Sequence, residues 1–87
     1  MQNEHKPIFV ETLQEMRSGW GQDPLSEKFL EVYWKELKKF SPGQFQVAVE
    51  KLLANYKVRW RGDFPTALDF YEAIPNFIPE DKEKRNG

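Results

Sequence analysis

The chain has 87 residues, which makes one domain that buries about 60–65% of its unfolded surface. Hydrophobic residues make up 39% and aromatic residues 15% of the sequence, enough for a packed core without disulfides. There is no cysteine, which excludes a disulfide framework, a thiolate zinc site and a catalytic thiol. The 13 Lys and Arg nearly balance the 14 Asp and Glu, so the chain lacks the global basic charge of a dedicated nucleic-acid binder.

The ends of the chain are polar. Residues 1–6 lack the apolar core of a secretion signal, and no apolar run approaches the roughly 18 residues that a membrane-spanning helix needs. We therefore predict a cytoplasmic protein with no membrane contact. We expect a helical domain at 7–78, flanked by a disordered N-terminus at 1–6 and a disordered charged tail at 79–87.

The first predicted helix spans about 7–18. Pro7 suits the first turn because its fixed φ angle matches the helix. The apolar positions recur at spacings of four and three along one stripe: Phe9, Leu13 and Met16. The helix should end at 19–21, where two glycines allow the left-handed geometry that stops helices, and Trp20 should fold back onto the core.

The second predicted helix begins at Asp23-Pro24, a capping acid followed by proline, and continues to about Lys39. Its apolar face is predicted to comprise Leu25, Phe29, Val32 or Tyr33, Leu37 and Phe40. Trp34 lies about 100° round the helix from Tyr33, at the boundary of that face. A large aromatic residue there indicates either core packing or a partner contact.

The third predicted helix has the clearest start signal, a capping box in which Ser41 and Gln44 exchange hydrogen bonds. Its apolar stripe is nearly ideal and predicts the central helix of the fold: Phe45, Ala48, Val49, Leu52, Leu53 and Tyr56. A last helix should begin after Thr66, with Asp69 three residues on, and end at Pro75.

The predicted architecture is an all-α, single-domain bundle of about four helices. The residues expected in its core are Phe9, Leu13, Phe29, Tyr33, Leu37, Phe45, Ala48, Val49, Leu52, Leu53, Tyr56 and Ile74.

The connector at 57–63 alternates cations with Val58 and Trp60, which is unusual for a loop that only reverses direction. It can cover the end of the bundle, anchor a protein contact, or hold phosphates and stack on a base. The near-neutral charge favours a core lid or a protein contact over a nucleic-acid contact. The predicted partner-binding residues are Trp34, Lys57, Arg59, Trp60 and Arg61.

Enzymatic chemistry finds little support in the sequence. His5, the only histidine, lies in the polar N-terminal segment, and Gly19 and Gly21 lack the residues of a phosphate-binding loop. Acid pairs on the helices are typical of solvated surface. We therefore expect no enzymatic activity, no catalytic residues, no cofactor and no metal.

Three short patterns follow one another along the chain: Tyr33-Trp34-x-x-Leu37, Phe45-x-x-Ala48-Val49-x-x-Leu52 and, after the basic connector, Phe64-Pro65-Thr66. Their order, over about half of the chain, resembles the small helical N-terminal domain of a phage family of replicative-helicase loaders and inhibitors. The resemblance implies a non-enzymatic phage or mobile-element protein in the host cytoplasm. Its partners would be a hexameric replicative helicase, which it holds inactive, and an origin-binding initiator that receives the helicase.

In that family a flexible C-terminal region engages the helicase, whereas only about a dozen residues follow Ile74 here. Either the chain is a shortened form, or the partner is contacted through the folded surface. Two alternatives remain open: a small nucleic-acid-binding protein that uses the connector from Lys57 to Arg61, and a protein inhibitor of another host enzyme.

Overall fold

The computed structural model describes residues 1–74, so the end of the predicted domain and the charged stretch at 79–87 lie outside the described residues. Within 1–74 the chain forms helices and no strand, in the order η1 (Asn3–His5), α1 (Lys6–Gly19), α2 (Glu27–Leu37), α3 (Pro42–Asn55) and α4 (Ala67–Glu72). The prediction of a small all-α bundle of about four helices is confirmed.

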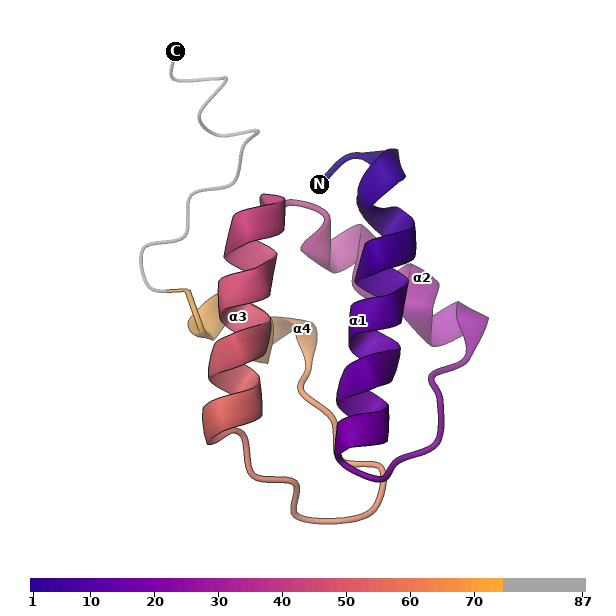
Figure 1. Ribbon diagram of the computed structural model, residues 1–87, viewed down its shortest axis with the longest axis vertical. Helices are drawn as coiled ribbons and strands as arrows, with labels where there is room; N and C mark the ends of the chain where they lie inside the picture. Colours follow the sequence, from indigo (N-terminus) through magenta and orange to yellow (C-terminus); the bar gives the residue numbers. More distant parts are fainter. Residues whose placement is uncertain (75–87) are drawn as a thin grey trace.

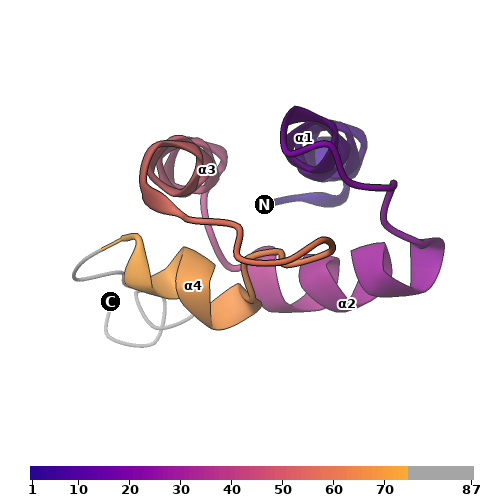
Figure 2. The same ribbon diagram turned by 90° about the horizontal axis from the view of Figure 1, so that it is seen from below.

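The helices form two layers. Helices α1 and α3 lie side by side and run in the same direction, and α2 and α4 lie across them in the second layer (Figures 1 and 2). The connector between α3 and α4 passes the C-terminal end of α1 before it turns back to α4 (Figure 1). This path brings the connector next to the segment that joins α1 to α2.

Two predicted capping boxes are present. The Ser41 hydroxyl accepts from the Gln44 backbone N–H at 3.1 Å, and the Gln44 side chain accepts from the Ser41 N–H at 2.9 Å. Thr66 and Asp69 make the same exchange at the start of α4. These contacts satisfy backbone donors that a helix start leaves without partners.

The predicted start of α2 at Asp23-Pro24 is wrong. The helix begins at Glu27, and Ser26 caps it: the Ser26 hydroxyl accepts a hydrogen bond from the Phe29 N–H at 3.3 Å. The preceding residues are held off the helix by Gln14 of α1, whose side chain binds both the N–H and the C=O of Leu25, at 2.8 and 3.0 Å. Leu25 is thus tied to α1 and lies outside α2.

The buried side of α2 also differs from the predicted one. Its core-facing residues are Leu30, Trp34 and Leu37, while Phe29, predicted for the core, is 60% exposed. One residue corresponds to about 100° of rotation, so the error exchanges a buried for an exposed position. Leu53 is also wrongly predicted, because it lies about 100° round α3 from the buried Leu52.

The remaining core prediction is largely confirmed. Seven of the residues expected there are buried: Phe9, Leu13, Leu37, Phe45, Ala48, Val49 and Leu52. Three others, Tyr33, Tyr56 and Ile74, are half-buried and pack against this cluster. The core also contains residues that the core prediction omitted: Met16, Leu30, Trp34, Phe40 and Phe70.

Residues 1–6 were expected to be disordered, but residues 3–5 form η1 and Lys6 begins α1. The amino group of Met1 donates to the carbonyl oxygens of Lys38 and Phe40, the latter at 2.6 Å. These carbonyls follow the end of α2, where helical acceptors lose their partners. Composition could not reveal the contact, because its two halves lie more than thirty residues apart in sequence.

Candidate functional site

The connector is organised around the carboxylate of Asp63, which is only 4% exposed. Its Oδ1 accepts from the Tyr56 hydroxyl at 2.6 Å, and its Oδ2 accepts from the Arg59 backbone N–H at 3.0 Å. The Arg59 Nε lies 3.6 Å from the same Oδ2. This carboxylate therefore joins the end of α3 to the middle of the connector.

The hydrogen bonds change the acidity of both partners. The bond from Tyr56, followed by that from the Arg59 amide, lowers the pKa of Asp63 below its ordinary value. Burial and the Asp63 carboxylate raise the pKa of Tyr56 to about 12. At neutral pH the pair is therefore a phenol that donates to an ionised carboxylate.

The tip of the connector is a tight turn closed by a hydrogen bond from the Asp63 N–H to the Trp60 carbonyl, at 3.0 Å. Gly62 has a φ of 95° in this turn, a backbone conformation that is strained for residues other than glycine. From the other side, the buried Gln22 donates to the Asp63 carbonyl at 2.7 Å. The connector is thus fixed to the segment between α1 and α2.

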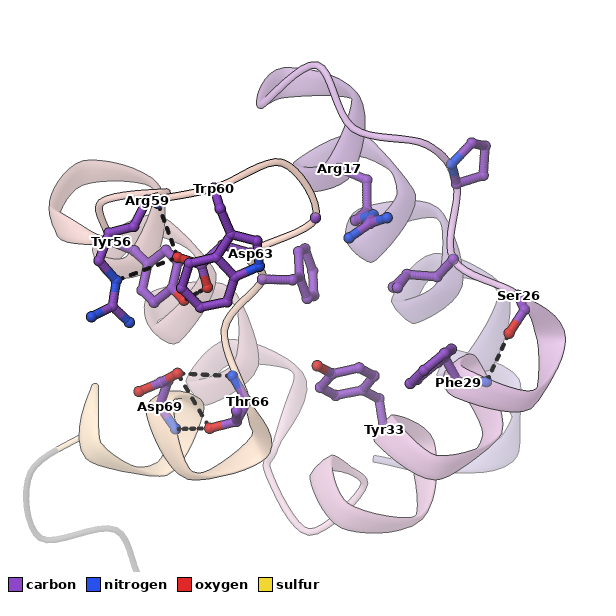
Figure 3. Close-up of a pocket in the computed structure, with 14 residues that line it drawn as sticks. Arg17, Ser26, Phe29, Tyr33, Tyr56, Arg59, Trp60, Asp63, Thr66 and Asp69 are labelled. Carbon is purple, nitrogen blue, oxygen red and sulfur yellow. Dashed lines mark hydrogen bonds and ion pairs between the residues drawn. The ribbon is translucent and has the colours of Figure 1, made fainter.

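These constraints leave an open groove of about 570 Å³ between the connector, α2 and the start of α4. Figure 3 shows Trp60 of the connector on one side of the groove and Phe29 of α2 on the other. The two side chains are 59% and 60% exposed. We call this feature the aromatic groove. The residues that line it include Arg17, Phe29, Tyr33, Arg59, Trp60 and Phe64.

The base of the aromatic groove is rigidly packed. The Phe64 ring lies edge-on to Tyr33 and to Trp20, with centroid distances of 5.9 and 5.8 Å. The Tyr33 hydroxyl donates to the Pro65 carbonyl at 2.8 Å, which ties α2 to the turn before α4, and burial raises the pKa of Tyr33. As predicted, Trp20 folds back, and its ring also contacts Tyr56 at 5.7 Å.

Two arginines border the groove, and each lies over an aromatic ring. The Arg17 guanidinium carbon is 5.5 Å from the centre of Phe64, and that of Arg59 is 5.3 Å from the centre of Trp60. Such stacking restrains a guanidinium and leaves its edge available to an acceptor. Arg17 also donates through Nε to the Asp23 carbonyl, at 2.6 Å.

The four predicted connector residues, Lys57, Arg59, Trp60 and Arg61, are all exposed. Only Arg59 and Trp60 line the aromatic groove, so the structure does not gather the whole cluster into one site.

Trp34 is a wrong site prediction. It is 6% exposed and packs edge-on against Phe9, with ring centroids 5.2 Å apart, because the shifted phase of α2 turns it into the core.

Four of the six residues named for the aromatic groove were not among the predicted site residues: Arg17, Phe29, Tyr33 and Phe64. Phe29 was assigned to the core because it continues the predicted apolar ladder from Leu25, a residue that precedes α2 in the structure. The spacing of Leu30, Trp34 and Leu37, at four and three residues, is the local signal for the face that is buried. Arg17 carried no signal, because its role depends on the Phe64 ring, which is distant in sequence.

A second groove, of about 520 Å³, lies between η1, α1 and α3. It is lined mainly by apolar side chains, including Ile8, Phe9 and Val49, and contains none of the predicted site residues.

Within residues 1–74, no three acidic or histidine side chains come close enough together to form a metal-ligand set. In the same range, no helix has the length and apolar character needed to cross a membrane. No protein-family model, curated protein or solved structure matches this chain.

Proposed function

We propose that this chain is a non-enzymatic protein that binds a replicative DNA helicase and inhibits or loads it. The observation that supports a protein contact is the aromatic groove, whose two walls are the half-exposed Trp60 and Phe29. Tryptophan and arginine dominate the binding energy of protein interfaces, and both occur here on a preorganised surface.

The helicase as partner rests on the resemblance to the phage loader and inhibitor family. Most of the matched positions are core residues, among them Trp34, Leu37 and Phe45, and Pro65 is fully buried. The matched positions are therefore mainly packing positions, and they support a common architecture more strongly than a common partner. If the protein acts as a loader, it would also bind the origin-binding initiator that receives the helicase.

Nucleic-acid binding is the second candidate function. Three exposed cations, Lys57, Arg59 and Arg61, flank the exposed Trp60, a combination that suits a phosphate backbone and a stacked base. Against it stand the formal net charge of −1 and the pairing of Arg59 with Asp63. Inhibition of a different host enzyme would use the same groove as the first proposal.

Affinity capture from a lysate of the bacterial host tests the proposal. The tagged chain should retain the replicative helicase, identified by mass spectrometry, and Trp60→Ala should lose it. Leu53→Ala is the matched control, because Leu53 is half-exposed but lines neither groove. Recovery of no helicase or other replication protein by the wild-type chain would rule the proposal out.

The same preparations distinguish the second candidate. A mobility-shift assay with single-stranded and duplex DNA should show no complex at low salt. A complex that weakens steeply as salt rises would instead favour a phosphate contact by the connector cations.

A further inference from the structure

Four charged side chains line the aromatic groove, two arginines and two carboxylates, so their formal charges cancel. Two carboxylates line it, but both have partners within the chain. Asp63 accepts from Tyr56 and from the Arg59 amide, and Asp69 accepts from the N–H and the hydroxyl of Thr66. Asp63 uses both oxygens in these bonds and pairs with Arg59, and Asp69 uses its Oδ2 in the cap of α4. Arg17 is thus the charged lining side chain with neither an ion pair nor a capping role within residues 1–74.

Arg17 is the groove cation best suited to bind an anion. It forms no ion pair with any residue in 1–74. Its Nε is occupied by the Asp23 carbonyl, and its guanidinium rests on Phe64, so its orientation is set before a ligand arrives. Figure 3 shows its terminal nitrogens directed toward the groove. A stacked, oriented guanidinium matches a carboxylate at low entropic cost.

Much of the remaining lining is apolar or aromatic. Phe29 and Trp60 project from α2 and from the connector, and Leu25, Tyr33 and Phe64 are half-buried between them. The Tyr33 hydroxyl is already bonded to the Pro65 carbonyl, so the ring offers its face. An aliphatic or aromatic side chain that enters this space loses water from both partners, which is the main source of interface affinity.

We propose that the aromatic groove binds a short acidic segment of the partner protein, in which a leucine or phenylalanine side chain enters between Phe29 and Trp60 while a carboxylate pairs with Arg17. This proposal rests on the proposed function in one respect, that the partner is a protein. The arrangement favours a peptide over a polyanion, because a nucleic acid needs several cations along its backbone and Arg59 is already paired with Asp63.

The test uses the full chain labelled with ¹⁵N and three probes: an amphipathic peptide of Leu, Ala and Glu, the same peptide with Lys for Glu, and an oligo-dT strand. The acidic peptide should give saturable shifts of the Trp60 indole signal and of the Phe29 and Phe64 amides. The Trp60 signal is assigned by its loss in Trp60→Phe. The Lys peptide should bind at least about tenfold more weakly, as expected if a charge pair contributes.

Matched variants separate charge from folding. Arg17→Met keeps an apolar stem over Phe64 and removes the cation. The acidic peptide should therefore bind this variant at least about tenfold more weakly than the wild type, whereas the affinity of the Lys peptide should not fall. Lys51→Met, an exposed change on α3 away from the groove, should leave both affinities unchanged. An unchanged spectrum outside the groove would show that each variant is folded.

Several results would overturn the proposal. One is the absence of a saturable shift with the acidic peptide, and another is equal affinity for the two peptides. The others are shifts confined to residues of the second groove, and tighter binding of oligo-dT than of the acidic peptide. A free chain that is dimeric, and becomes monomeric on Trp60→Ala, would assign the groove to a second copy instead.

Because the peptides are used alone, this experiment can succeed even if the capture of helicase fails. Conversely, recovery of helicase in equal amounts by wild type and Arg17→Met would support the proposed function and contradict the acidic-segment proposal.

Discussion

Asp63 determines the shape of the connector at the scale of single residues. It is the buried acceptor for the Tyr56 hydroxyl and the Arg59 amide, and its own backbone carbonyl is bound by Gln22. Trp60, next to this network, is exposed, and its carbonyl accepts the Asp63 N–H in the turn that contains Gly62. The polar network thus holds in place the side chain that the proposed contact uses.

This network predicts an acid-sensitive stability. The folded pKa of Asp63 lies below the ordinary 3.8, so its contribution is complete above that value and is lost as pH falls through the lowered folded pKa. Urea midpoints measured between about pH 6 and about pH 2 should therefore fall less steeply for Asp63→Asn than for the wild type. Parallel curves for the two proteins would contradict the role of the carboxylate.

At the same scale, Tyr56 should titrate late. Its folded pKa of about 12 lies above the ordinary 10.0, so the stability it contributes is present below pH 10 and disappears as pH rises through the folded value. The ultraviolet titration of the phenols should contain a late component that is missing in Tyr56→Phe. In Asp63→Asn that component should move toward lower pH, because the carboxylate no longer opposes ionisation.

At the scale of elements, α2 begins after the cap at Ser26. Ser26→Ala should cost about 1 kcal/mol in unfolding free energy, as should Ser41→Ala at the start of α3, because each removes a cap. Asp23→Ala should cost little, since Asp23 uses its backbone carbonyl and not its side chain toward Arg17. A larger loss for Asp23→Ala than for Ser26→Ala would place the helix start where the sequence first suggested.

Helix α3 offers a second test at this scale, in a pair of adjacent leucines. Leu52 is 8% exposed and Leu53 is 49% exposed. Leu52→Ala should therefore cost about 2–5 kcal/mol, and Leu53→Ala should cost a small fraction of that. Chemical denaturation checks both, and equal losses would mean that the assigned face of α3 is wrong.

The elements also explain what the sequence could predict. The boxes at Ser41 and Thr66 were predictable because both partners of each lie within four residues. The buried face of α2 was not, because Phe29, Tyr33 and Leu37 recur at helical spacing just as the buried Leu30, Trp34 and Leu37 do, and packing against the other helices decides between the two sets. The exposure of Trp60 could be suspected from its charged neighbours, whereas the burial of Trp34 depended on that unpredicted face.

At the scale of the whole molecule, the aromatic groove exists only because distant segments meet. Arg17 lies in the last turn of α1, Phe29 in the first turn of α2 and Trp60 in the connector. Gln22 bridges the α1–α2 segment to Asp63. No local pattern links these positions, so the sequence suggested half of the site, the connector, and missed the other wall. The groove lies beside a packed core.

The central claim is that the aromatic groove is the surface that binds the protein partner. It is tested most directly by the affinity of the captured helicase for wild type, Trp60→Ala, Phe29→Ala and Leu53→Ala. Loss of either groove wall should weaken binding at least about tenfold, because large aromatic residues at interface centres contribute about 2 kcal/mol or more. Leu53→Ala should bind like the wild type. Unchanged affinity of both groove variants would contradict the claim.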